Sequence, residues 1–243
     1  MKSVITITSI VMLSLGASYV SAQDNVLASR STACSINPGY TMADVVETAR
    51  NFEWPAESAP GFVTFREGIA VGGNNPEIDF IAEFIYPSYA DMIEKRSAFL
   101  RSRAGRSGRR GLDGVATCND NVWISNVIPA RRPGPGSIAP VTPVASTLCE
   151  LNGATVADAV ALANAFGESI GAAGAAVVSR NFGGPRRPIN SAVGMRFFFG
   201  SFTDFGAGMD MLNQNNTAAN QGTAISCSTG NLTRSYRIYS RNN

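Results

Sequence analysis

The sequence predicts an α+β protein made of two tandem units, each with the element order β-α-β-β-α-β, and three observations indicate this class. A pattern of cysteines, helix starts and strands occurs twice along the chain, in the same order and at similar spacing. Within each copy, runs with the helical hydrophobic period alternate with runs of strand-like period. A proline-rich segment lies between the copies. We therefore expect two similar units instead of one large domain.

Length and composition limit the classes of function. The chain has 243 residues, of which 44% are hydrophobic and 16% charged, so it can bury a core. A net charge of +2 does not favour a nucleic-acid partner or an anionic membrane surface. The chain has no histidine, which excludes Ser-His-Asp and Cys-His triads and HExxH zinc sites. We expect no metal and no cofactor.

Residues 1–22 have the features of a secretory signal peptide. Lys2 supplies a positive start, Val4–Leu15 is mostly apolar, and small residues at Val20–Ala22 predict cleavage before Gln23. The apolar run is shorter than the roughly 20 residues that a bilayer-spanning helix needs. We therefore expect an exported protein of the periplasm or the extracellular space of a bacterium, with no membrane insertion after cleavage.

The duplication is seen in matching motifs. Cys34-Ser-Ile-Asn and the following Thr-x-x-Asp recur as Cys149-Glu-Leu-Asn and a second Thr-x-x-Asp, and Cys118 matches Cys227. The expected units are residues 23–128 and 147–243. Between them, residues 129–146 are rich in proline and glycine, which is typical of an extended, semi-rigid linker.

The first unit begins with a strand around its first cysteine. A helix follows from Thr41, where Asp44 completes a capping box, and it ends before Pro55. Two strands, Phe62–Val71 and Ile78–Tyr86, flank a Gly-Gly-Asn-Asn-Pro turn. A second helix starts at Ser88 and a last strand spans Val122–Val127.

The second unit has the same order of elements. Its first helix is capped by Thr155 with Asp158 and is expected to end at Gly167. The strands and the remaining helix start follow in sequence: Ala175–Phe182, Ala192–Phe199, Ser201 and Leu232–Tyr239.

This order is the ferredoxin-like arrangement, whose sheet has helices on one face only. A tandem pair covers the bare faces by packing sheet to sheet, as dimeric α+β barrels do, so we expect a pseudo-dimeric monomer. The first and last strands of each unit are antiparallel neighbours in this topology. We therefore predict the disulfides Cys34–Cys118 and Cys149–Cys227, because thiols of exported proteins are oxidised.

The pattern resembles a group of secreted, duplicated bacterial proteins of unknown function. The fold is also similar to the dimeric α+β barrel superfamily, which includes cofactor-independent monooxygenases, chlorite dismutase and relatives of dye-decolourising peroxidases. The residues that carry the resemblance are Cys34, Cys118, Cys149, Cys227, Thr41, Asp44, Thr155 and Asp158. They imply the fold and no catalytic role. The haem-binding relatives use a histidine ligand, so the absence of histidine argues against haem.

The third strand of each unit suggests where a site could lie. Successive side chains point to opposite faces of a sheet. Phe80, Ala82, Phe84 and Tyr86 should meet the helices, so Asp79 and Glu83 should face the gap between the sheets, with Arg196 opposite. Arg66 and Arg180, at the ends of the second strands, are expected near the mouth of this gap.

Two interpretations of these charges remain open at this point. Arg196 could clamp a small anionic or zwitterionic ligand in a polar pocket. Alternatively, Glu83 and Arg196 form an ion pair that aligns the two sheets, as buried opposite charges usually do.

Three functions follow from the sequence. The favoured one is a non-enzymatic module that binds a small ligand or a partner. The second is a cofactor-independent oxygenase acting in the inter-sheet cavity, where only Asp79, Glu83, Tyr86 or Tyr89 could act as an acid or base. The third is a purely structural envelope protein.

The basic segment Lys95–Arg110 is interpreted as a helix end that runs into a solvated loop.

Overall fold

The structure is a computed structural model that describes residues 26–71, 78–103, 112, 114–134, 136–183, 191–215 and 224–241. The expected signal peptide, residues 1–22, lies outside the described residues, as do residues 104–110 of the basic segment.

The first repeat has the expected order of elements. Its strands and helices are β1 (Leu27–Ile36), α1 (Met42–Arg50), β2 (Phe62–Ala70), β3 (Phe80–Tyr86), α2 (Tyr89–Arg101) and β4 (Ala116–Arg131). The capping box predicted at the start of α1 is present, with the Thr41 hydroxyl accepting from the Asp44 amide and the Asp44 carboxylate accepting from the Thr41 amide.

The second repeat follows the same plan. Its elements are β5 (Val141–Glu150), α4 (Val156–Ser169), β6 (Gly174–Phe182), β7 (Ala192–Phe198), α5 (Phe202–Asn215), β8 (Ser226–Cys227) and β9 (Asn231–Ser240). Strands β4 and β5 reach into both ends of the proline-rich segment, so residues 132–140 connect the two repeats.

The prediction that α4 ends at Gly167 is wrong, because the helix continues to Ser169. Gly167 is a packing position inside this helix. A Cβ atom there would lie 3.3 Å from the Cβ of Ala175 on β6, so glycine permits the close approach of helix and sheet.

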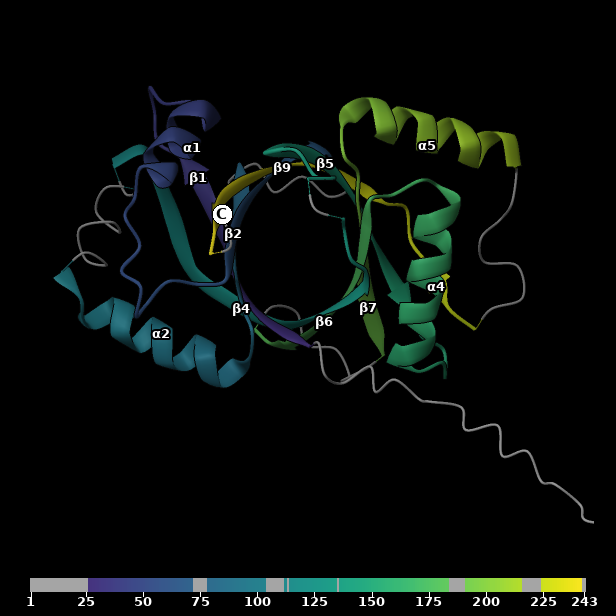
Figure 1. The fold of residues 1–243 in the computed structure, drawn as a ribbon, viewed down its shortest axis with the longest axis horizontal. Coiled ribbons are helices and arrows are strands. Elements are labelled where there is room, and N and C mark those ends of the chain that lie inside the picture. Colours follow the sequence, from purple (N-terminus) through teal and green to yellow (C-terminus); the bar gives the residue numbers. More distant parts are fainter. Residues whose placement is uncertain are drawn as a thin grey trace, which may run out of the picture.

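The sheet closes into a barrel. Its strand order is β7-β6-β4-β1-β3-β2-β9-β5, and β5 pairs with β7 to complete the ring. Figure 1 shows this ring end-on, with α1 and α2 on one side and α4 and α5 on the other. The pseudo-dimeric ferredoxin-like fold is confirmed, and the structure adds that the two sheets also join edge to edge. The antiparallel pairs β2–β9 and β4–β6 form the two seams between the repeats.

Both predicted disulfides are present. Cys34 lies opposite Cys118 in the β1–β4 register, and Cys149 lies opposite Cys227 in the β5–β8 register. The bridges span 84 and 78 residues, and loops of this length correspond to about 4–5 kcal/mol of stabilisation in the chain-entropy model. No helix in the described ranges is long and apolar enough to cross a membrane.

The two repeats differ in how their cores are filled. Under α4 and α5, the buried apolar side chains form one continuous cluster that includes Met195, Phe197 and Phe199. Under α1 and α2, the buried side chains form two clusters, one around Val45 and Phe65 and a smaller one around Tyr86. The first repeat therefore has a divided core.

Candidate ligand-binding sites

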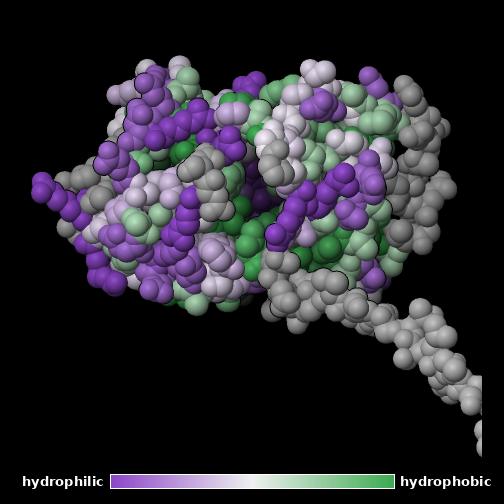
Figure 2. Space-filling model, viewed as in Figure 1, coloured by the Kyte–Doolittle hydropathy of each residue, from purple (hydrophilic) through white to green (hydrophobic). Residues whose placement is uncertain are grey.

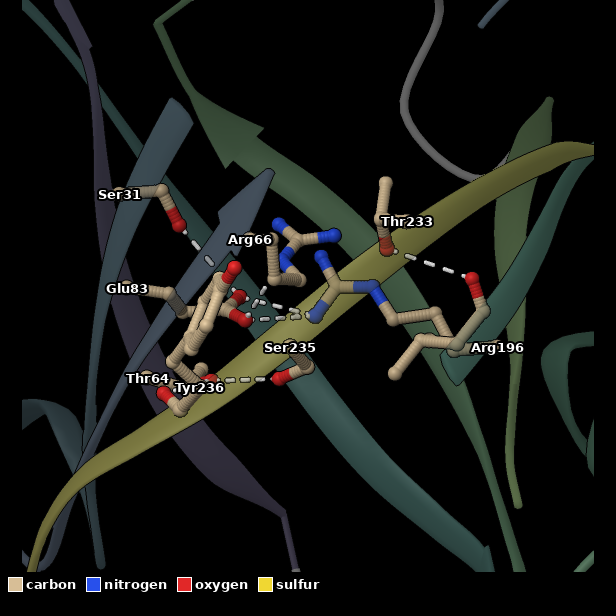
Figure 3. A network of polar contacts seen from close by, with 9 residues as sticks. Ser31, Thr64, Arg66, Glu83, Arg196, Thr233, Ser235 and Tyr236 are labelled. Carbon is tan, nitrogen blue, oxygen red and sulfur yellow. Dashed lines mark hydrogen bonds and ion pairs between the residues drawn. The ribbon is translucent and has the colours of Figure 1, made fainter. Parts of the chain in front are cut away.

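The first candidate site lies inside the barrel, where residues from both repeats meet. Nη1 of Arg196 donates to both carboxylate oxygens of Glu83, at 2.9 Å and 2.8 Å. Nε of Arg66 lies 3.5 Å from the same carboxylate, and the Ser31 hydroxyl donates to it at 3.4 Å. Figure 3 shows both guanidinium groups directed toward Glu83. The ion pair between the repeats is thus present, and Arg66 joins it.

Burial and charge act in opposite directions on Glu83. Burial raises the pKa of this carboxyl. The charges of Arg196 and Arg66 and the hydrogen bonds from Arg196 and Ser31 lower the pKa by a larger amount, so its net value is about 2. Burial and the neighbouring Arg196 lower the pKa of Arg66 to about 10, although Glu83 opposes this shift. Glu83 and Arg66 are therefore both charged at neutral pH.

The other two residues expected near the gap do not join this cluster. Asp79 is exposed just before β3, and its carboxylate accepts the backbone N–H of Ile36 at 2.7 Å, which ties β1 to β3. Arg180 is exposed near the end of β6, where it lies opposite Ser125 on the inward face, with its guanidinium 5.5 Å from the ring centre of Trp123. The structure thus brings together Glu83, Arg66 and Arg196 but not Asp79 or Arg180.

The second candidate site is a cavity of about 800 Å³ on the outer face of the first-repeat sheet. Its floor comes from β1, β2 and β3, and its walls come from α2 and from the end of α1 with the segment that follows. The cavity borders both apolar clusters of the first repeat, since Phe65 belongs to one and Tyr86 to the other.

Aromatic side chains dominate one wall of this cavity. Trp54 is their centre, with ring centroids 4.9 Å from Phe52, 5.3 Å from Phe99 and 6.2 Å from Phe84. Its indole Nε1–H is buried and has no hydrogen-bond partner within the described ranges. A buried donor of this kind usually has a partner, so this wall offers one donor to a ligand.

Two arginines and a tyrosine supply further polar groups. The guanidinium of Arg30 lies 6.0 Å from the ring centre of Phe84, and that of Arg96 lies 5.5 Å from the ring centre of Phe99. Burial raises the pKa of Tyr86, an effect that the charges of Arg96 and Arg30 oppose, so its hydroxyl stays protonated at neutral pH. The cavity therefore combines flat apolar walls with two arginines, and Glu53 also lines it.

The second repeat shows that these polar groups are not needed for the fold. Arg30 pairs with Phe84 across β1 and β3, and the equivalent pair across β5 and β7 is Ala145 with Phe197. Arg96 lies eight residues after Ser88, which caps α2. The equivalent position, eight residues after Ser201 at the start of α5, is Met209. The matches of Ala82 and Tyr86 on the third strand are Met195 and Phe199. The second repeat thus fills with apolar side chains the space that the first leaves open.

Strand alternation did not predict this cavity. The pattern placed Phe80, Ala82, Phe84 and Tyr86 on the side of β3 that meets the helices, with no space between them. One signal was available, because alanine stands at position 82 where the second copy has methionine.

The described residues contain no group of three acidic or thiol side chains placed to hold a metal ion. The protein is therefore a two-repeat α+β barrel. A cavity lies between sheet and helices in the first repeat, and a continuous apolar core lies there in the second.

The chain was compared with known families, sequences and solved structures. No protein-family model and no curated protein sequence matches the chain. Among solved structures, an anthrone oxidase-like protein is 14% identical over 91% of this chain and 97% of its own, with a TM-score of 0.49. A mutant chlorite dismutase from Candidatus Nitrospira defluvii is 12% identical over 89% of this chain and 93% of its own, with a TM-score of 0.43. Because the identities are low and the TM-scores are below 0.5, the function is argued from the sites themselves.

Proposed function

We propose that this protein binds a small molecule in the cavity between α1, α2 and the outer face of the first-repeat sheet. The observation that carries the proposal is a cavity of about 800 Å³ in one repeat, set against a filled core in the other. Ligand sites in proteins have volumes of roughly 300–1,000 Å³ and are mostly apolar with a few polar groups. The two disulfides agree with a protein that works after export.

The ligand that fits this cavity is flat, partly aromatic and negatively charged. Trp54, Phe84 and Phe99 offer ring faces for stacking, which aromatic groups favour. Arg30 and Arg96 favour an anionic group, because a guanidinium pairs with carboxylates, sulfonates and phenolates.

A probe pair tests the site and its charge preference. Anilinonaphthalene sulfonate has aromatic rings and a negative charge, and N-phenylnaphthylamine has the same ring system without the charge. We expect Ala82→Met, which copies the second repeat, to abolish binding of both probes. Ala90→Met is the matched control, because Ala90 is exposed on α2 and does not line the cavity.

The role of Arg30 and Arg96 in anion binding is tested by replacing each with the residue type found at the equivalent position of the second repeat. We expect Arg30→Ala and Arg96→Met to weaken sulfonate binding about tenfold or more and to leave the neutral probe unchanged, because a hydrogen bond to a charged group contributes about 1.5–3 kcal/mol. Equal losses for both probes would contradict the anionic preference. Full binding by Ala82→Met would contradict the site itself.

The two tryptophans report on the location of a bound probe. Trp54 lines the cavity and Trp123 faces the barrel interior, opposite Ser31 in the strand register. We expect a bound probe to quench Trp54 in a Trp123→Phe background and to leave Trp123 unchanged in a Trp54→Phe background. Native mass spectrometry of the protein from its own host would then identify the natural ligand.

The oxygenase alternative required an acid or base in the inter-sheet cavity. Glu83 is ion-paired there with a pKa of about 2, and Asp79 is exposed and bound to a backbone amide. Burial raises the pKa of both Tyr86 and Tyr89, so both phenols are protonated at neutral pH. Tyr86 lines the outer cavity and Tyr89 packs beside it from α2, so neither phenol lies in the barrel, and ligand binding is the proposal that the geometry favours.

A further inference from the structure

The charges inside the barrel do not balance. Arg66 and Arg196 face a single carboxylate, that of Glu83, and no other carboxylate in the described ranges lies within ion-pair distance of either guanidinium. The three side chains are only 9%, 11% and 2% exposed in the order Arg66, Arg196, Glu83. This buried cluster therefore carries one positive charge in excess, and an uncompensated buried charge is costly.

Hydrogen bonding in the barrel is also incomplete. Nε of Arg66 is buried and has an ion-pair contact with Glu83 but no hydrogen-bond partner in the described part of the chain. The hydroxyl of Ser29 is fully buried and likewise has no partner there. Ser29 lies two residues before Ser31 on β1, so both hydroxyls point to the same interior face. Native proteins rarely leave such groups without a partner.

Small side chains line part of the barrel interior. Many of the side chains that face inward are small, since strand alternation and register place Ser29, Ser31, Thr64, Ser125, Ala176, Gly194 and Ser235 on this side. An eight-stranded barrel is just wide enough to be filled by side chains or to hold one small ligand. The side chains of Arg66 and Arg196 keep 9% and 11% of their surface accessible, so a water-sized probe reaches part of each side chain. Figure 2, viewed down the barrel, shows a hydrophilic hollow at its centre.

We propose that the barrel interior binds one small monovalent anion beside Arg66, on the face of the sheet opposite to the cavity under α1 and α2. Arg196 is committed to Glu83 by two hydrogen bonds, so Arg66 is the residue that supplies the excess charge. A halide, nitrate or formate has the charge and the size for this position, and hydroxyls of the barrel can donate to it. This site is independent of the proposed function of the outer cavity.

Thermal unfolding at constant ionic strength tests the site. Sodium nitrate or formate is exchanged for the sodium salt of a bulky sulfonate that cannot enter the barrel. We expect a saturable rise in Tm with the small anions, of about 5 °C or more at one hundred times the Kd, because a ligand that binds only the folded state stabilises it. The effect should be absent in Arg66→Gln, which leaves Glu83 and Arg196 as a neutral pair.

Arg234→Gln is the matched control, because Arg234 is a half-exposed arginine that pairs with Glu67 outside the barrel. It should keep the full anion effect, as should Ala82→Met, which alters only the outer cavity. An equal rise with the bulky sulfonate, or an undiminished rise in Arg66→Gln, would overturn the proposal.

A crystallographic measurement on the wild type does not depend on whether the Arg66→Gln variant folds. Wild-type crystals soaked in bromide should show an anomalous peak inside the barrel within contact distance of the Arg66 guanidinium. A barrel interior without such a peak, at a bromide concentration that saturates the Tm effect, would refute the site.

Discussion

Glu83 holds two buried arginines at the centre of the molecule, and its removal is the sharpest single-residue test of the barrel. We expect Glu83→Gln to lower the free energy of unfolding by about 3–5 kcal/mol, because it leaves two buried guanidinium groups without a counter-charge. Urea denaturation monitored by circular dichroism measures this. Glu67→Gln is the control, since the partly exposed pair of Glu67 with Arg234 should contribute at most about 1 kcal/mol. Similar losses for both variants would show that burial of the ion pair is unimportant.

The same carboxyl predicts how stability depends on pH. Its folded-state pKa of about 2 is below the ordinary value of 4.5, so the folded protein holds this proton less tightly than the unfolded chain. The stabilisation from Glu83 is therefore complete above about pH 4.5 and is lost as the pH falls toward 2. We expect the urea midpoint of the wild type to fall across this range more steeply than that of Glu83→Gln. Parallel curves for the two proteins would contradict the depressed pKa.

At the scale of the elements, α5 shows how closely the helices of the second repeat pack. Gly208 on α5 faces the C-terminal end of α4, and a Cβ atom there would lie 2.5 Å from the Ile170 carbonyl oxygen and 3.0 Å from the Phe199 ring. The backbone of this helix therefore approaches α4 as closely as glycine allows.

Two glycines of one helix give a matched pair of substitutions. We expect Gly208→Ala to destabilise the protein by about 1–3 kcal/mol, because α5 must shift to avoid the clash. Gly206→Ala meets no atom within 4 Å and should stabilise by about 0.5–1 kcal/mol through helix propensity. Thermal unfolding of both variants measures the difference, and equal stabilisation by both would show that α5 is not tightly packed.

Strand alternation allowed much of the barrel to be predicted from the sequence. The period of two placed Glu83 and Arg196 on the inward face, and the repeat placed each cysteine opposite its partner. The alternation did not hold for Asp79, because this residue precedes β3 and its carboxylate accepts a hydrogen bond from the backbone amide of Ile36. The outer cavity could not be predicted in this way, because it depends on how far α1 and α2 stand apart over small residues such as Ala82.

On the scale of the whole molecule, the two repeats are predicted to unfold together. Strands β2 and β9, from different repeats, share a hydrogen-bonded seam, as do β4 and β6. We expect Phe197→Ala, in the core of the second repeat, to cost about 3–5 kcal/mol and to lower the unfolding midpoint reported by Trp54 in the first repeat. Fluorescence in the Trp123→Phe background, compared with calorimetry, measures this. An unchanged Trp54 midpoint with a second calorimetric transition would show that the repeats are independent.

The seam between β2 and β9 also sets an order of events during synthesis. Strand β9 is the last described strand to leave the ribosome, yet its partners are β5, the first strand of its own repeat, and β2 near the start of the chain. Until it emerges, β2 and β5 each present an open edge, the kind of surface on which strands of other chains add. A nascent chain therefore cannot close its barrel before residues 231–240 are available. Chains stopped short of this strand should aggregate, even though they contain almost the whole of both repeats.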